Sequence, residues 1–294
     1  MVTSQNVSSQ DALMSAKLQK RIVTILFNLI VGFGGLLMAT PLVWMLSASL
    51  KPTSEIYRFP PTLIPEQFTL ASYERLFSDW PFAAWYVNSL VVAVVTTLAV
   101  LFFSSLAGFG FAKYRFKGNR VLFMIVLAST MIPFQLILVP LFIVMSRLSW
   151  TNSYYALIIP FMAPAVSIFL MRQFISSIPS ELMESARIDG ATEFGIYWRI
   201  IVPLARPAFA ALAILTFLGS WNSFLWPLSV LRQQTAMTLP VGMASMLGGV
   251  TAGSEAPIGA SMAGATLITI PVIIVFIAVQ KHYIAGLTAA SIKG

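Results

Sequence analysis

The chain has 294 residues, of which 58% are hydrophobic and only 10% are charged. Soluble domains are closer to half apolar and a quarter charged, so this composition indicates a membrane protein. The lack of cysteine excludes disulfides and cysteine-bound metals, and the single histidine, His282, excludes a histidine metal site. The formal net charge of +8 raises the question of nucleic-acid binding, which the placement of the charges answers below.

Six windows of the sequence contain no Asp, Glu, Lys or Arg and are long enough to cross a bilayer, which takes about 20 residues. Because backbone groups in lipid must be satisfied within the protein, each window is predicted to be a helix. The predicted fold is an all-α, polytopic membrane protein with six transmembrane helices. The windows are residues 22–50, 80–112, 121–146, 148–171, 207–231 and 256–280.

The distribution of Lys and Arg predicts the orientation. A cytoplasmic N-terminus places 13 of the 18 basic residues on the cytoplasmic side and 5 outside, so the positive-inside rule predicts that both termini are cytoplasmic. The net positive charge then reflects topology and anionic lipid, and no nucleic-acid partner is expected. A cleaved signal ending near residues 47–49 is the alternative for the first window, but that window far exceeds the roughly 7–15 residues of a signal core.

Three parts of the chain are expected. Residues 1–20 form a cytoplasmic tail, residues 21–286 the transmembrane domain, and residues 287–294 a second cytoplasmic tail. The first outside loop, residues 51–79, carries four prolines and is expected to be ordered but not helical. Prolines in the third and fourth windows predict kinks.

Between the fourth and fifth windows lies a compact stretch, residues 177–207, which we term the charged segment. Ser180 is predicted to N-cap a short helix whose first turns carry Glu181 and Glu184, where the helix dipole favours acidic groups. Asp189 and Gly190 are predicted to end that helix, because glycine readily adopts the left-handed conformation of a C-cap.

A second helix is predicted to follow in the charged segment, with Thr192 as its N-cap and Pro203 near its end. Its apolar positions recur at helical spacing and predict one face packed on the bundle. An amphipathic helix lying on the membrane surface is the alternative for the whole segment, but the first helix has little apolar face for lipid. The predicted apolar face consists of Phe194, Tyr197, Trp198 and Ile201.

The sequence ESARIDGA, at residues 184–191, resembles the EAA loop of permease subunits of binding-protein-dependent ABC importers. Six stretches in the same order, one of which contains this loop, resemble the carbohydrate branch of that family, the MalG-like subunits; among them are MIPFQLILVPLF, SWNSFLWPL and TLPVG. The resemblance implies a MetI/MalG-like transmembrane domain in the bacterial cytoplasmic (inner) membrane. It also implies an ATPase-coupling role for Glu181, Glu184, Ser185, Ala186, Asp189, Gly190, Ala191 and Pro203.

The same resemblance implies several partners: a second, related permease subunit, two cytoplasmic ABC ATPase subunits and an extracytoplasmic solute-binding protein. No glycine is followed by lysine, so the chain has no P-loop, and ATP and Mg are expected only on the partner ATPases. No cofactor, metal or enzymatic activity is therefore expected of this chain. An ion-coupled secondary transporter is the alternative, but all ten acidic residues lie outside the six windows, which favours ATP coupling.

The fifth window contains the sequence SWNSF, which predicts a solute pathway. Aromatic faces bind the C–H surfaces of sugars, and hydroxyl or amide groups bind their OH groups. The expected solute is an oligosaccharide, glycoside or polyol derivative, and the alternative is a non-sugar solute such as glycerol phosphate. Trp226 is assigned instead to the outer aromatic belt. The candidate pathway residues are Ser220, Trp221, Asn222, Phe224, Gln135 and Thr130.

Overall fold

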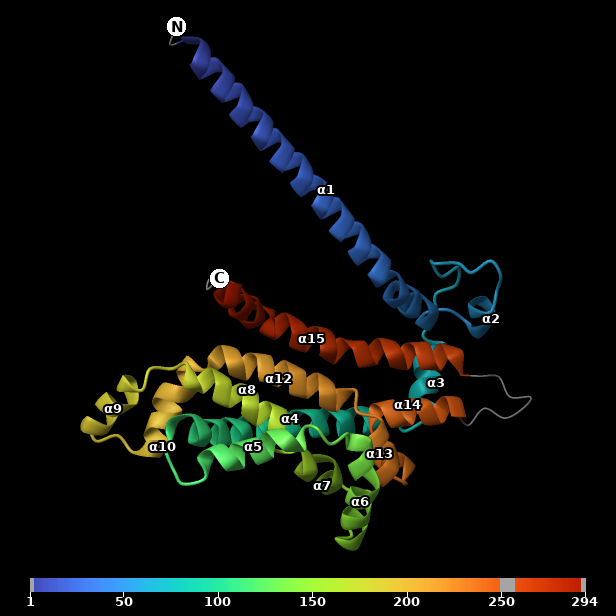
Figure 1. Cartoon of the computed structure of the whole chain (residues 1–294). Helices are drawn as coiled ribbons and strands as arrows, with labels where there is room; N and C mark the ends of the chain where they lie inside the picture. The colour runs from blue at the N-terminus through green and yellow to red at the C-terminus, as the bar shows by residue number, and fades with distance from the viewer. Residues whose placement is uncertain (1–2, 249–256, 292–294) are drawn as a thin grey trace. The chain divides into compact units, whose positions relative to one another are not determined.

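A computed structural model describes the backbone of residues 3–248 and 257–291, and the side chains of residues 19–248 and 257–278. Within these ranges the chain is built from helices without strands, as Figure 1 shows. The predicted all-α class is therefore confirmed.

Three helices are long and apolar enough to cross a membrane without a break: α1 (Thr3–Ser49), α4 (Phe82–Lys113) and α15 (Ile258–Ser291). Over the described residues the number of spans rises to six if each bent pair of helices counts as one span. Helix α1 begins well inside the predicted N-terminal tail, and α15 continues through Ser291. The C-terminal tail was predicted from residue 287, and its residues 292–294 lie outside the described range.

The remaining candidate spans are three bent pairs of helices. In one of them, Glu193–Leu204 and Arg206–Trp221 meet at 79°. Helices α5 (Asn119–Ser129) and α6 (Phe134–Arg147) meet at 97°, while α7 (Tyr154–Ile158) with the 3-10 turn Ile159–Phe161 meets α8 (Ala165–Ser176) at 42°. Pro133 and Pro164 stand directly before α6 and α8 in extended conformation. Proline lacks an N–H group and disfavours helical geometry in the residue before it. The predicted kinks are thus confirmed at Pro133 and Pro164, whereas α6 continues through Pro140.

The chain divides into two compact units, the first made of residues 1–72 and 258–266 and the second of residues 73–257 and 267–294. In the second unit α4 is the central helix, packed most extensively on α8 and on α12 (Arg206–Trp221). Gly108 permits the contact between α4 and α8, since a Cβ atom there would lie 2.8 Å from the Arg172 backbone nitrogen. Close packing on α4 therefore organises this unit.

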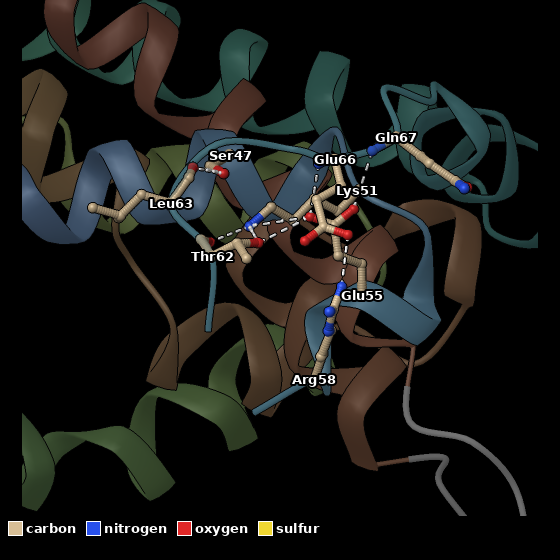
Figure 2. A network of polar contacts seen from close by, with 8 residues as sticks. All are labelled: Ser47, Lys51, Glu55, Arg58, Thr62, Leu63, Glu66 and Gln67. Atoms are coloured by element: carbon tan, nitrogen blue, oxygen red, sulfur yellow. Dashed lines mark hydrogen bonds and ion pairs between the residues drawn. The ribbon is translucent and has the colours of Figure 1, made fainter. Parts of the chain in front are cut away.

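The first outside loop belongs largely to the first unit, and it is not free of helix as predicted. It contains α2 (Thr53–Ile56) and leads into α3 (Ala71–Asp79). The loop also contains an internal polar core. Figure 2 shows this core, which is centred on Lys51 and Glu55.

Lys51 and Glu55 are both buried, and their charged groups lie 3.8 Å apart. The Glu55 carboxylate accepts hydrogen bonds from the Thr62 hydroxyl at 2.9 Å and from the backbone N–H groups of Glu66 and Gln67 at 3.0 and 3.4 Å. The hydrogen bond from the Glu66 N–H group is the main reason that the pKa of Glu55 lies below its ordinary value. A buried charge is tolerated only when it is paired and hydrogen-bonded, and this network meets that condition.

Candidate functional site

The first half of the charged segment is a short helix with a sharp end. Helix α9 (Glu181–Ile188) is followed by Gly190, whose φ is +82°. The Gly190 N–H group donates to the Arg187 carbonyl at 3.0 Å, and the Ala191 N–H group to the Ala186 carbonyl at 2.9 Å. These two bonds form a Schellman motif, so the glycine-ended corner is confirmed. Ser180 has helical dihedrals and makes no side-chain cap, so that predicted N-cap is wrong.

Most side chains of helix α9 are exposed on the surface of the chain. Met183 is 2% exposed and anchors the helix in a core with Ile175 and Tyr197. Ile188 at the tip is 87% exposed. Of the predicted coupling residues, Ala186 and Pro203 are half-buried, and the exposed ones are Glu181, Glu184, Ser185, Asp189, Gly190 and Ala191. The exposed coupling residues thus lie on α9 and in the turn that follows it, whereas Pro203 lies apart from them in the short helix Val202–Leu204.

The second half of the charged segment differs from the predicted simple helix. Thr192 caps α10 (Glu193–Ile196) by accepting a hydrogen bond from the Gly195 N–H group at 3.1 Å, which confirms that cap. The chain then passes through a π-helical turn (Tyr197–Ile201) into α11 (Val202–Leu204), where Pro203 lies.

The π-helical turn changes which side chains face the bundle. Its i to i+5 spacing places Ile196 and Ile201 on the same side, and both are fully buried with Tyr197. Phe194 and Trp198 are 58% and 46% exposed, so assigning them to the buried face was wrong. The Tyr197 hydroxyl is hydrogen-bonded to that of Ser105 on α4 at 2.6 Å. Tyr197 is therefore the main anchor of this half.

The two halves of the charged segment are tied together and to the end of α4. The Arg187 guanidinium donates to both oxygens of Glu193, at 2.7 and 3.2 Å, across the glycine corner. The Tyr114 hydroxyl, just beyond α4, donates to Glu193, and the Lys113 ammonium donates to the Ile178 carbonyl before α9. Burial and then Glu193 raise the pKa of Tyr114 to about 12, so this phenol remains a donor.

The role of Glu193 and Tyr114 was missed in the sequence. Arg187 and Glu193 have opposite charges on the two sides of an Asp-Gly turn, which is a local signal for an ion pair across the corner. Tyr114 lies 79 positions before Glu193, and no local pattern links them.

At the other end of α4 the fifth predicted window is broken into α12 and α13 (Leu225–Val230), with residues 222–224 outside helical structure. A cavity of about 420 Å³ lies at this break. Three of the predicted pathway residues, Ser220, Phe224 and Gln135, line it. Non-helical backbone at membrane depth is tolerated where it lines a cavity or is covered by protein.

Three predicted pathway residues do not line this cavity. Trp221 is 1% exposed and stacks on Phe217 in the core against α4, with ring centroids 5.8 Å apart. Asn222 is exposed, and its amide donates to the Leu218 carbonyl at 3.0 Å. Thr130 is exposed at the end of α5 and donates to the Leu127 carbonyl at 2.7 Å.

Trp226 belongs to the cavity, so its assignment to the outer aromatic belt was wrong. It is 3% exposed, and its indole N–H donates to the Ala156 carbonyl at 2.9 Å. Its ring packs edge-on against Phe134 and Phe161, which also line the cavity. This aromatic group comes from three separate elements and was not visible as a sequence motif.

The segment between α13 and α14 (Leu239–Gly248) closes one side of this region through bonds to the start of α4. The Trp85 indole donates to the Gln234 carbonyl at 2.7 Å, and the Asn88 amide donates to the carbonyls of Thr235 and Met237 at 2.9 Å each. Gly242 accommodates the Trp85 ring, which would lie 2.2 Å from a Cβ atom at that position. The residues before α14 are thus held in place by side chains of α4.

Comparison with known proteins identifies the class. Residues 100–288 match the family described as "Binding-protein-dependent transport system inner membrane component". The chain belongs to this family, and it is a membrane permease component of a transport system of the ABC importer type.

Individual relatives cover nearly the whole chain. The arabinooligosaccharides transport system permease protein AraQ of Bacillus subtilis is 41% identical over 266 residues, covering 88% of this chain and 92% of its own. The galactooligosaccharides permease protein GanQ of the same organism is 33% identical, covering 94% and 98%. A crystal structure of a bacterial ABC transporter that imports the acidic polysaccharide alginate matches with a TM-score of 0.80 at 26% identity, covering 90% and 97%.

Gly190→Val tests the corner of the charged segment. No atom lies within 4 Å of a Cβ built there, so the effect comes from forcing a β-branched residue into positive φ, at about 1–2 kcal/mol. We expect ATP hydrolysis by the assembled transporter to continue while solute uptake per ATP falls severalfold. Gly118→Val is the matched control, since Gly118 also has positive φ (87°) and open surroundings. Equal uptake per ATP in the two variants would contradict the role of the corner.

Glu193→Gln tests the clamp that joins Arg187, Glu193 and Tyr114. Because the pair is about half exposed, the loss in local stability is expected to be only about 0.5–1 kcal/mol. We expect faster amide hydrogen exchange in residues 187–196 and a parallel loss of uptake. Arg199→Gln also removes one exposed charge of the segment and breaks no ion pair among the described side chains. Unchanged exchange in Glu193→Gln, or the same change in both variants, would disprove the clamp.

Proposed function

We propose that this chain forms half of the translocation pathway for an uncharged sugar or oligosaccharide in an ATP-driven importer. The observation that carries the proposal is the cavity at the break in the fifth span. Aromatic rings and hydroxyl or amide groups line it, and none of its lining residues is charged. Its volume of about 420 Å³ lies within the roughly 300–1,000 Å³ of small-molecule sites.

The relatives support the choice of a sugar. Those named above are permeases for arabinooligosaccharides and galactooligosaccharides, and a further one is the trehalose transport system permease protein SugB of Mycobacterium tuberculosis, 34% identical over 272 residues. The alternative solute, glycerol phosphate, carries charge that calls for a cationic group. The cavity wall of this chain offers none among its lining residues.

The proposed assembly contains a second related permease, two cytoplasmic ABC ATPases and a solute-binding protein. The charged segment is the proposed contact with an ATPase, because it projects from the bundle and is rigidly clamped at both flanks. ATP and Mg are proposed to bind the ATPases and not this chain, which performs no covalent chemistry itself. A bacterial alginate ABC transporter has been crystallised in complex with an alginate pentasaccharide-bound periplasmic protein, and a chain of that complex shares this fold with a TM-score of 0.60 at 18% identity.

Both termini are proposed to be cytoplasmic, with the charged segment on the same side. The chain has no native cysteine, so single cysteines test this directly. Thr53→Cys in the first loop is expected to react with a membrane-impermeant thiol reagent in intact cells. Lys117→Cys, between α4 and α5, is expected to react only after permeabilisation. The reverse pattern would overturn the orientation and the proposed contact with the ATPase.

Uptake by the reconstituted transporter tests the function. Proteoliposomes containing both permeases and the ATPases, supplied with the solute-binding protein, are expected to accumulate radiolabelled arabinotriose in the presence of ATP and Mg. Omission of ATP or of the binding protein should abolish accumulation. Glycerol phosphate and an alginate trisaccharide serve as charged comparison solutes. Uptake of a charged solute, with none of arabinotriose, galactotriose or trehalose, would refute the proposed solute class.

A further inference from the structure

The cavity wall carries two buried hydroxyl groups that have no hydrogen-bond partner within the described structure. They belong to Thr96 in α4 and Thr238 directly before α14, and each residue is 4% exposed. Both residues line the cavity at the break in the fifth span. Buried polar groups in folded proteins are nearly always paired, so an unpaired one calls for a physical explanation.

Thr96 departs from the usual behaviour of threonine in a helix. A helical threonine often donates its hydroxyl hydrogen to the carbonyl four residues earlier. Its neighbour Thr97 does so, with a bond of 2.7 Å to the Ala93 carbonyl, and Thr266 bonds to the Met262 carbonyl at 2.9 Å. Thr96 has a comparable position in α4 without such a bond. Its hydroxyl therefore has no partner among the described residues, and Thr96 lines the cavity.

Thr238 departs from its usual role in a different way. A threonine directly before a helix commonly caps it with its side-chain oxygen. Here the second helical residue is Pro240, which has no N–H group to donate, and the Thr238 hydroxyl has no partner among the described residues. The N–H group of Leu239 donates to the Ser89 hydroxyl at 2.7 Å. The Asn88 amide donates a hydrogen bond to the carbonyl of Met237, the residue before Thr238. Thr238 is thus held at the cavity wall by the bonds that its two neighbours make to α4.

The surroundings of these hydroxyls define the chemistry of a ligand. The aromatic rings of Trp226, Phe134 and Phe161 supply apolar faces for C–H groups, while hydroxyls and an amide supply hydrogen bonds. A carboxylate or phosphate would enter a wall that has no lining cation to compensate for its desolvation. An uncharged polyhydroxylated ring satisfies both the apolar and the polar parts of the wall.

We propose that the cavity is a binding subsite for one unit of a neutral sugar within this chain, and that Thr96 and Thr238 determine its specificity. The proposal rests on the proposed function and adds the location and charge selectivity of a sugar contact. Each hydroxyl pairs with a hydroxyl of the bound sugar, which replaces the partner that the protein does not provide. Selection against acidic sugars follows because the subsite pairs hydroxyls and lacks a cation.

Equilibrium binding of radiolabelled arabinotriose to the complete transporter in nanodiscs, without the binding protein, tests the subsite. Loss of one neutral hydrogen bond corresponds to an increase in Kd of about three- to tenfold. We expect this increase for Thr96→Val and Thr238→Val, which keep the side-chain shape. Thr96→Ser retains the hydroxyl and should bind within twofold of wild type. Thr97→Val, one position away, is the matched control, because its hydroxyl is already paired within the helix.

The outcomes separate this proposal from the proposed function. Wild-type arabinotriose uptake combined with unchanged Kd in Thr96→Val and Thr238→Val would overturn the subsite and leave sugar transport intact. Equal losses in Thr96→Val and Thr97→Val, or failure of Thr96→Ser to restore binding, would also overturn it, because packing would then explain the effect. So would wild-type uptake without measurable binding to the assembly. A wild-type transporter that takes up no neutral sugar would refute the proposed function itself.

Assembly is checked separately so that misfolding cannot imitate lost binding. Each variant complex must elute with wild-type stoichiometry in size-exclusion chromatography. Because Thr238 lies outside α4, the helix that contains Thr96, the Thr238→Val variant gives an independent measurement. An alginate trisaccharide is expected to bind at least tenfold more weakly than arabinotriose to wild type. Equal binding of the two would disprove the charge selectivity.

Discussion

A helix that remains unbroken through a membrane keeps its backbone hydrogen bonds within itself, and α4 meets this requirement over 32 residues. The surrounding segments are bent or broken, and two of their helices, α8 and α12, pack on α4. Its first turns hold the segment before α14, its middle carries Thr96 at the cavity, and its end is tied to the charged segment. Both candidate sites, the cavity and the charged segment, thus depend on one continuous helix, α4.

The distance between these sites follows from helix geometry. At about 1.5 Å per residue, Thr96 and Tyr114 lie roughly 27 Å apart along the axis. A transporter that switches almost completely between two states needs a bias of about 5 kcal/mol, which a flexible connection would dissipate. The Schellman corner at Gly190, the clamp through Glu193 and the buried Tyr197 each reduce the freedom of the charged segment. Under the proposed contact with an ATPase, force applied to the charged segment would reach the cavity through α4.

The buried polar groups of this protein differ in whether they have a hydrogen-bond partner within the chain. Lys51, Glu55 and Asn88 have their hydrogen-bonding groups paired within the chain, and they hold loops in defined positions. Thr96 and Thr238 are unpaired at a cavity wall. A paired group lowers the free energy of one fold, whereas an unpaired one costs stability unless a ligand binds it. Among the described residues, Ser104, Trp221 and Ser261 also carry unpaired buried groups but do not line the cavity, so only Thr96 and Thr238 combine the two features.

The sequence by itself determined the helical membrane class, the breaks at Pro133 and Pro164, the corner at Gly190 and the Thr192 cap. These features are local. The membrane class depends on hydropathy, the breaks and the corner depend on the backbone dihedrals of proline and glycine, and the cap depends on a side chain that binds the N–H group three residues ahead. Only the tertiary structure decided that Trp226 faces the cavity and that Trp221 packs in the core. It also introduced the π-helical turn that exposes Trp198, and it paired Tyr114 with Glu193. These outcomes depend on which distant segments pack together, because a broken or bulged helix no longer presents the faces that regular spacing predicts.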